Sequence, residues 1–442
     1  MLTRLLNSKF KKDLSFSYIT QAITVSFGFL QLFLINRYFG VATFGQLAII
    51  MSTAGIFSSL LTAKSSEAVT RFFKREELKQ NYENAKFVLL IGFSIDFITA
   101  MLLVALIYFA STFIATIFLK DIELQDEIVL YSFITFFGFL RGTLFGYLQS
   151  KEMFVNMNIV TMIESFMKIA MIISFIFIWN LTNLDDIIYS FLVASMASFS
   201  YTIYIFLTSY LKEFKNIKLQ INKKLLKEYW SFNIKTFLSS SLKIGATNID
   251  NLILGYYSNN ETVGIYQTIK KFLSPLSFIT APFSSLMLPK LIGYYEKGEV
   301  EYFHKLIFNI TIKIIVVSSA ILFVFYSSLH ILFNIQNIEY NNIIFISFLI
   351  ASFQSLLSVL VWFGRIFYIM YNPTLPIYSN LLLSINSIWI PILLYKIDYF
   401  DDLIAICLGM LLSYFPSWLF TITVYLKFIR KNKINLIYYR SK

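Results

Sequence analysis

Nine charged side chains lie inside long apolar segments of this sequence, where hydrocarbon would surround them if the segments crossed a membrane. They are Asp96, Arg141, Glu164, Lys168, Lys243, Asp250, Lys270, Lys271 and Lys313. A charged group at the centre of a lipid-facing helix costs about 2.5–3.5 kcal/mol on an insertion scale. We therefore expect these groups to pair with one another or to line a water-filled interior.

Two pairs can be proposed from spacing. Glu164 and Lys168 are four residues apart, so they lie on one face of a helix and can neutralise each other. Asp250 and Lys270 or Lys271 lie at comparable depth on either side of a short connection. After these pairings the remaining charges are mostly cationic, which favours an anionic substrate such as a diphosphate.

The residue types and this charge balance predict two roles. We expect the cations to bind substrate: Arg141, Lys243, Lys270, Lys271 and Lys313. We expect the acids to couple transport to protons or sodium ions: Asp96, Glu164 and Asp250.

The composition predicts an all-α polytopic membrane protein. Of the 442 residues, 57% are hydrophobic and only 14% are charged, and the mean hydropathy is +0.68. Such a chain cannot cover a soluble surface with polar side chains. Its apolar segments are about 20 residues or longer, which suits membrane-spanning helices and excludes a β-barrel of short alternating strands.

Twelve spanning helices are expected. The first six are Ser15–Asn36, Phe44–Ala63, Ala85–Phe109, Ile128–Gln149, Asn158–Asn180 and Ile187–Leu211. The second six are Trp230–Tyr257, Thr262–Pro289, Phe303–Ser327, Asn342–Tyr368, Pro373–Tyr395 and Leu403–Phe428.

A short internal similarity predicts how these helices are grouped. Tyr38-Phe39 followed by Thr43-Phe44-Gly45 resembles Tyr256-Tyr257 followed by Thr262-Val263-Gly264. The two copies begin six spans apart, so they would form a parallel repeat of two six-helix lobes around a central cavity. The predicted domains are residues 1–211, a cytoplasmic basic linker at 212–229, and residues 230–442. The linker suits either an amphipathic helix on an anionic lipid surface or a solvated connection.

Basic residues gather in alternate connections between the spans. One set holds Arg4, Lys9, Lys11, Lys12, Arg71, Lys74, Arg75, Lys79, Lys212, Lys215, Lys218, Lys223, Lys224, Lys227, Arg430, Lys431, Lys433, Arg440 and Lys442. The opposite set holds few, namely Arg37, Lys120 and Lys396. The positive-inside rule then places both termini in the cytoplasm. The net charge of +12 reflects this topology, so we expect no nucleic-acid partner.

Residues for metal or covalent chemistry are scarce. The chain has one cysteine, Cys407, and two histidines, His304 and His330, and none has partners at ligand spacing. We expect no metal and no cofactor. No connection is long enough to hold a soluble catalytic domain, so we do not expect an enzyme.

Small residues on one helix predict close packing. Gly138, Gly142 and Gly146 recur every four residues around Arg141. This spacing forms a ridge that a neighbouring helix can approach closely.

Two hairpins resemble a known family. Asp250-x3-Leu254-Gly255 followed by Val263-Gly264-Ile265-Tyr266, and Asn36-Arg37-Tyr38-Phe39-Gly40 with Thr43-Phe44-Gly45-Gln46, are similar to the Wzx-type polysaccharide flippases of the multidrug/oligosaccharidyl-lipid/polysaccharide exporter superfamily. The resemblance implies alternating access of two six-helix lobes in the bacterial cytoplasmic (inner) membrane. It also implies export of undecaprenyl-diphosphate-linked oligosaccharide units for O-antigen or capsule, alongside polysaccharide polymerase and chain-length machinery.

Two other functions stay open at this point. A multidrug or cation antiporter would share the fold, although it needs carboxylates facing its cavity. A membrane-embedded polysaccharide polymerase would need a large external loop, which this sequence lacks.

Overall fold

The computed structural model describes residues 8–62, 65–241, 248–276, 299–364, 367 and 375–440. These residues form helices and turns, and no strand occurs among them. Ten helices in these ranges are long and apolar enough to cross a membrane. The prediction of an all-α polytopic membrane protein is confirmed.

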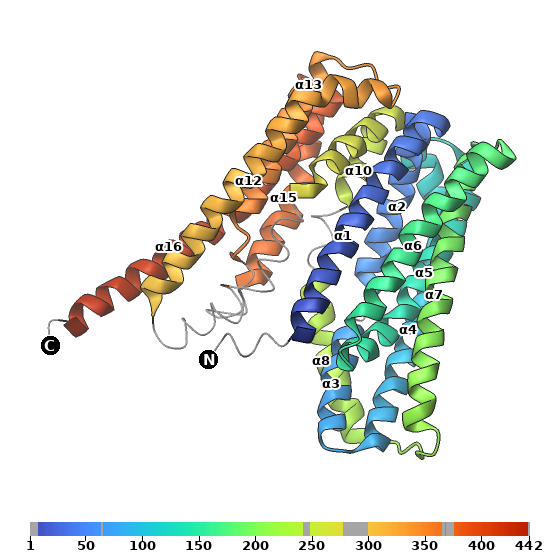
Figure 1. Ribbon diagram of the computed structural model, residues 1–442. Coiled ribbons are helices and arrows are strands. Elements are labelled where there is room, and N and C mark those ends of the chain that lie inside the picture. The colour runs from blue at the N-terminus through green and yellow to red at the C-terminus, as the bar shows by residue number, and fades with distance from the viewer. Residues whose placement is uncertain are drawn as a thin grey trace. The chain divides into compact units, whose positions relative to one another are not determined.

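The chain divides into two compact units, Met1–Ser241 and Leu242–Lys442. In chain order, the first contains α1 (Ser8–Leu34), η1 (Ile35–Phe39), α2 (Val41–Leu61), α3 (Ser65–Leu78), α4 (Tyr82–Ile114), η2 (Ala115–Leu119), η3 (Ile122–Leu124), α5 (Gln125–Ser150), α6 (Phe154–Ser174), η4 (Phe175–Trp179), α7 (Leu184–Phe214) and α8 (Lys223–Ser241) (Figure 1). The lobes predicted at 1–211 and 230–442 stay a prediction.

Three helices of the first unit end in the same way. The π-helical turns η1, η2 and η4 follow α1, α4 and α6 directly. Each is closed by a residue with positive φ, namely Gly40 (94°), Lys120 (57°) and Asn180 (53°). The widened last turn and the residue with positive φ end the helix and let the chain leave it sharply.

Helix α3 was not predicted, because residues 65–78 were assigned to a connection. The structure places Ala68, Val69, Phe72 and Phe73 on a buried face of this helix. Their spacing repeats every three to four residues, which is the signal of an amphipathic helix. The helix is too short and too polar to cross a membrane, and it packs instead against α4 and α5.

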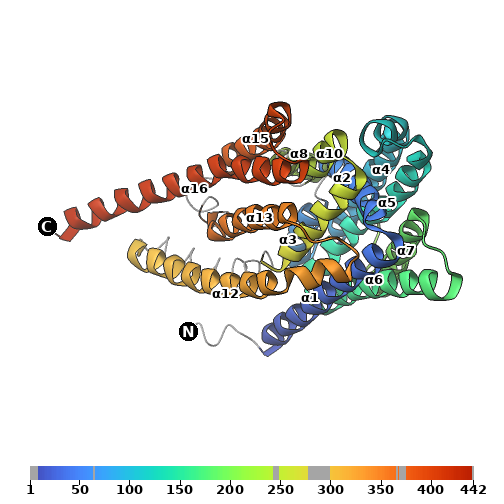
Figure 2. The same cartoon turned by 90° about the horizontal axis from the view of Figure 1, so that it is seen from above.

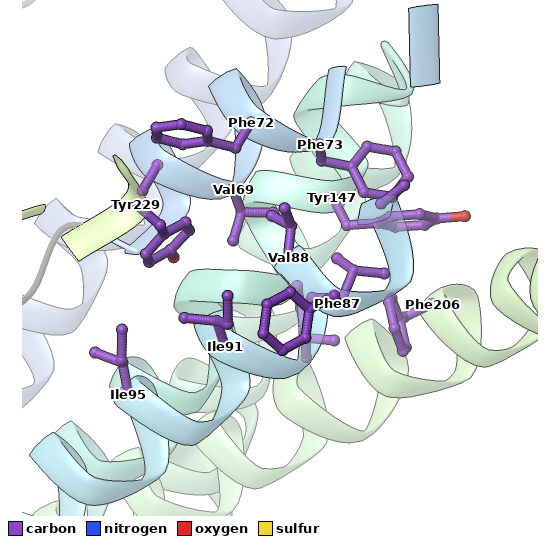
Figure 3. Close-up of a cluster of buried hydrophobic side chains, with 14 of the residues drawn as sticks. Val69, Phe72, Phe73, Phe87, Val88, Ile91, Ile95, Tyr147, Phe206 and Tyr229 are labelled. Atoms are coloured by element: carbon purple, nitrogen blue, oxygen red, sulfur yellow. The ribbon is translucent and has the colours of Figure 1, made fainter. Parts of the chain in front are cut away.

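The residues predicted to form a linker belong to the core of the first unit. Tyr229 of α8 is fully buried and its ring lies 5.5 Å from that of Phe72. Phe73 packs on Tyr147, and Tyr147 packs on Phe206, with edge-to-face contacts at 5.2 and 5.0 Å between ring centroids (Figure 3). Aromatic contacts of this kind add to the stabilisation from burial, so α8 is held as an integral part of this unit.

The second unit is described for a smaller share of its residues. It contains α10 (Ile249–Tyr257), a helix at 260–276, α12 (Val300–Ile335), α13 (Asn342–Leu360), α15 (Leu375–Ile397) and α16 (Asp402–Arg440). Within it α15 lies along α16 and α12 along α13, as α1 lies along α6 in the first unit (Figure 2).

Several predicted bounds differ from the structure. The span predicted at Asn342–Tyr368 is interrupted, because α13 stops at Leu360, a turn follows at 361–363, and residues 364 and 367 are helical again. The span predicted at Trp230–Tyr257 corresponds to α8 and α10, with residues 242–247 between them outside the described part. The span predicted at Thr262–Pro289 is described only as far as 276.

Large apolar side chains cover much of the outside of the spans. Phe109 is 80% exposed, Phe323 74% and Trp389 61%. Such exposure would promote aggregation in water, whereas in a membrane these rings contact lipid tails.

Glycines allow α5 to approach its neighbours closely. A Cβ atom added at Gly146 would lie 2.7 Å from the carbonyl oxygen of Ser66 in α3. A Cβ atom at Gly142 would lie 3.0 Å from Asp96 Oδ2 in α4, whereas at Gly138 it would meet nothing within 4 Å. The predicted ridge is therefore confirmed at two of its three positions.

These distances predict that Gly146→Ala lowers stability. The new methyl group must push α3 away from α5, which costs about 1–3 kcal/mol, and helix propensity returns at most about 1 kcal/mol. Thermal unfolding of the purified protein in detergent measures this, with Gly138→Ala as the matched control that keeps or slightly raises the melting temperature. Equal melting temperatures for the two variants would contradict the close contact.

Candidate functional site

Three charged side chains from two helices of the first unit form one cluster. Glu164 of α6 accepts from Arg141 of α5 at 2.5 Å (Nη1 to Oε2) and from Lys168 at 2.8 Å (Nζ to Oε1). Arg141 Nη1 also donates to Ser198 Oγ of α7 at 2.8 Å. The side chains of Arg141, Glu164 and Lys168 are only 14%, 21% and 23% exposed. We call Arg141, Glu164 and Lys168 the α5–α6 cluster.

The α5–α6 cluster carries a net positive charge, because two cations share a single carboxylate. The predicted Glu164–Lys168 pair is confirmed. The expectation that Arg141 stays outside that pair is wrong, since α5 packs against α6 and brings the guanidinium to the second carboxylate oxygen. A shared carboxylate neutralises only one of the two cations, so the cluster attracts anions.

A second charged group lies in the second unit. Asp250 Oδ2 accepts from Lys270 Nζ at 2.6 Å and from the Tyr266 hydroxyl at 2.8 Å. Asp250 is 4% exposed and Lys270 33%. The predicted pairing of Asp250 with Lys270 is confirmed, and it joins the two halves of the hairpin motif. One acid here meets one base, so this site is neutral.

Asp96, unlike Glu164 and Asp250, is not paired with a basic side chain among the described residues. It is 4% exposed, and its Oδ2 accepts a hydrogen bond from the backbone N–H of Thr143 at 2.7 Å. Among the described residues no cation lies within salt-bridge distance of it. The carboxylate therefore depends on neutral polar groups of neighbouring helices.

The remaining predicted cations are Lys313, Lys271 and Lys243. Lys313 of α12 is exposed on the helix face that also exposes Val316 and Val317. Lys271 is half-buried and has interactions of its own. Lys243 lies outside the described residues.

An ionic network that was not predicted from the sequence connects α3, α7 and α8 in the first unit. Lys151, between α5 and α6, meets Glu77 of α3 and Glu213 of α7, each at 2.5 Å. Arg75 of α3 meets Glu76 and Glu228 of α8, each at 2.9 Å. The partners lie on helices that are far apart in sequence, so spacing along the chain could not predict these pairs.

The network changes the ionisation of its members. Burial alone would raise the pKa of Glu77, but hydrogen bonds from Lys151 and Lys74 bring it below its usual value of 4.5. Burial alone would lower the pKa of Lys151, but Glu213 and Glu77 raise it. Both groups are therefore held in their charged forms.

A sequence profile described as polysaccharide biosynthesis protein matches residues 10–292, which is more than half of the chain. The chain belongs to this family. The predicted resemblance is thereby confirmed at the family level. No curated protein matches.

Solved structures with the same fold are membrane transporters. A multidrug resistance MATE family transporter of the MOP superfamily, in its inward-facing conformation, is 13% identical with a TM-score of 0.72, and the match covers 94% of this chain and 99% of that one. The lipid II flippase MurJ, in an inward closed conformation, is 16% identical with a TM-score of 0.69, covering 95% and 90%. A mutant of the Vibrio cholerae MATE transporter VcmN is 14% identical with a TM-score of 0.59, covering 96% and 99%.

The chain is therefore a multi-pass membrane protein of the polysaccharide biosynthesis family with the fold of these transporters. At these low identities the solved structures establish the fold of this polysaccharide biosynthesis protein. The substrate that this chain transports depends on its own charged side chains.

Replacing Glu164 with Gln should destabilise the first unit. The change leaves Arg141 and Lys168 close together without a counter-ion, at a cost of about 3 kcal/mol. Thermal unfolding in detergent measures the loss. Adding Lys168→Met to the Glu164→Gln variant should recover part of it, because one uncompensated charge is then removed. A Glu164→Gln variant as stable as the unmodified protein would show that the cluster does not need the carboxylate.

Replacing Lys151 with Met should lower stability by roughly 2 kcal/mol near neutral pH, because two charge-assisted hydrogen bonds are lost. Since the pKa of Glu77 is lowered by folding, its contribution is fully present above about pH 4.5 and is lost as the pH falls through the folded value. The difference in melting temperature from the unmodified protein should therefore shrink on acidification. Lys212→Met, at an exposed site, is the control, and a difference that stays constant with pH would contradict the coupling.

Proposed function

We propose that this protein is a flippase that moves undecaprenyl-diphosphate-linked oligosaccharide units across the bacterial cytoplasmic membrane, for O-antigen or capsular polysaccharide. The oligosaccharide and diphosphate pass through a polar interior by alternating access, while the polyprenyl tail stays in lipid. Membership of the polysaccharide biosynthesis family and the transporter fold support this proposal. Both termini are proposed to lie in the cytoplasm, as the basic connections predict.

The net positive charge of the α5–α6 cluster supports a substrate with an anionic head group. Two cations at the depth of the membrane share one carboxylate, and both are partly accessible. Arg and Lys bind phosphate oxygens through charge-assisted hydrogen bonds that are stronger in a low dielectric. A diphosphate would supply the negative charge that Glu164 alone does not provide.

The other predicted cations are proposed to guide the same substrate. They are Lys243, Lys270 and Lys271; Lys313 shares an exposed face with Val316 and Val317 and is not assigned this role. Lys270 is one-third exposed while paired with Asp250, so it can exchange part of that contact for a phosphate oxygen. Proton or sodium coupling is proposed to use the carboxylates.

A drug-cation antiporter fits these charges less well. Glu164 and Asp250 are engaged by basic partners, and Asp96 is enclosed by its own unit. An organic cation would meet positive charge at the α5–α6 cluster. A polymerase would need a large external loop, which the sequence lacks.

The test is a flipping assay in proteoliposomes that contain the purified protein and a defined undecaprenyl-diphosphate oligosaccharide. Arg141→Gln should slow flipping about tenfold or more, because one charge-assisted contact to phosphate contributes about 1.5–3 kcal/mol. Lys168→Gln should act in the same direction. Lys212→Gln removes the same charge at an exposed site and should leave the rate unchanged.

Two results would overturn the proposal. One is absence of flipping by the unmodified, monodisperse protein when the same vesicles show efflux of a cationic dye, which would favour the drug antiporter. The other is an unchanged flipping rate in Arg141→Gln, Lys168→Gln and Lys270→Gln together, which would remove the role of positive charge.

A further inference from the structure

Helix α8 of the first unit has two faces of different character. Leu225, Tyr229 and Asn233 recur every four residues and are buried, with exposures of 3%, 0% and 2%. This face packs against α3 and α4. The opposite face is exposed, so one side of α8 holds the helix in its unit and the other is open to a ligand.

An open groove of about 560 Å³ lies along the exposed face of α8. Its lining residues are three or four positions apart and therefore share one side of the helix. They are Lys223, Leu226, Lys227, Trp230, Ser231 and Ile234. We call this feature the α8 groove.

The first turns of the α8 groove are positively charged. Lys223 and Lys227 are four residues apart, so their ammonium groups can reach the same anion. Neither forms a salt bridge with any residue that the structure describes. Glu228, the acid next to them in sequence, is bound by Arg75 at 2.9 Å. Two cations at this end are therefore available to a negatively charged group.

The later turns of the α8 groove are apolar. Trp230 is 46% exposed and Ile234 51%, and the distance from Lys223 to Ile234 along the axis is about 16 Å. Tryptophan is enriched where a membrane meets water. A free anion would leave the apolar side chains uncovered, and a hydrocarbon would leave the lysines without a counter-ion. A molecule with an anionic head and an apolar chain satisfies both ends.

The connection that leads into α8 shows the same combination of side chains. Leu219 and Ile221 are 46% and 70% exposed beside Lys218, which is exposed as well. The connection is attached to its unit, because Lys86 Nζ donates to the carbonyl oxygen of Ile217 at 2.7 Å. Apolar side chains held outward among lysines are typical of a segment that contacts an anionic lipid surface.

We propose that the α8 groove binds an anionic phospholipid of the surrounding membrane. Its phosphate lies between the ammonium groups of Lys223 and Lys227, and one acyl chain lies along Trp230 and Ile234. The sequence allowed either lipid contact or a solvated connection for residues 212–229, and the groove favours lipid contact.

A bound lipid would hold α8 in its place on the unit. The inner face of the same helix contributes Tyr229 to the core, and Glu228 joins it to Arg75 of α3. A lipid on the outer face adds contacts that exist only while α8 is folded, so it should stabilise this part of the unit. The proposal does not rest on the proposed function.

The experiment uses phosphatidylglycerol with brominated acyl chains, which quench tryptophan fluorescence on contact. The purified full-length protein is placed in phosphatidylcholine vesicles that contain this lipid. Brominated phosphatidylcholine, with the same chains and no net charge, is the comparison. Phosphatidylglycerol should quench more at equal mole fraction, and the excess should fall as salt is added, because the contact is between charges.

Variants of the groove should remove this excess. Lys223→Gln combined with Lys227→Gln should lower the apparent affinity for phosphatidylglycerol about tenfold or more, because two basic side chains near the phosphate are lost. Trp230→Phe should abolish most of the excess quenching, since no other tryptophan lines the groove. All three positions are exposed, so these variants should fold.

Matched controls remove the same groups outside the groove. Lys224→Gln removes an exposed lysine of the same turn that does not line it, and the affinity for phosphatidylglycerol should be almost unchanged. Trp389→Phe removes a tryptophan of α15 that is 61% exposed, and it should lower quenching by both lipids equally.

Three outcomes would overturn the proposal. The first is equal quenching by the two lipids in the unmodified protein. The second is an undiminished excess in the double lysine variant or in Trp230→Phe. The third is displacement of phosphatidylglycerol by undecaprenyl diphosphate at a much lower mole fraction, which would assign the groove to the transported lipid. A phosphatidylglycerol excess with the expected variant effects, in a protein that flips no oligosaccharide, would support this proposal and reject the proposed function alone.

Discussion

The cost of a charge in hydrocarbon governs how this protein is built. Each of the three acids predicted near the middle of a span is met in a different way: Glu164 by two cations, Asp250 by an ammonium and a phenol, and Asp96 by a backbone N–H and neighbouring hydroxyls. These solutions differ in net charge, and the difference separates their roles. The positive cluster suits an anionic substrate, the neutral pair joins a hairpin, and the Asp96 carboxylate is held by neutral groups of its own unit.

Close packing in the first unit makes these arrangements stable. Gly142 and Gly146 let α5 approach α4 and α3, and a core rich in aromatic side chains surrounds Tyr147 and Phe73. The ionic network around Lys151 and Arg75 then ties α3, α7 and α8 together at one end of the unit. Such a unit is suited to act as a rigid body, which the proposed alternating access would require.

The fold is shared with transporters of different cargo, since a multidrug transporter and the lipid II flippase MurJ both resemble this chain. Fold therefore restricts the class of function, and the charged groups must decide the cargo. In this chain the acids available to an organic cation are engaged, and the α5–α6 cluster retains positive charge. That balance is the physical reason to favour a lipid-linked anion.

The six spans of the first unit followed from the sequence, because length and hydropathy are local properties. Glu164 with Lys168 was predictable for the same reason, since four residues on one helix define a common face. The three-to-four-residue spacing of apolar side chains in α3 was present in the sequence. It was overlooked because residues 65–78 also carry many charges. The pairing of Arg141 with Glu164 and the enclosure of Asp96 by Thr143, Ser65 and Tyr229 were decided only by the tertiary structure. They depend on how each helix is rotated and on which helix lies beside it, and these are set by packing between segments distant in sequence.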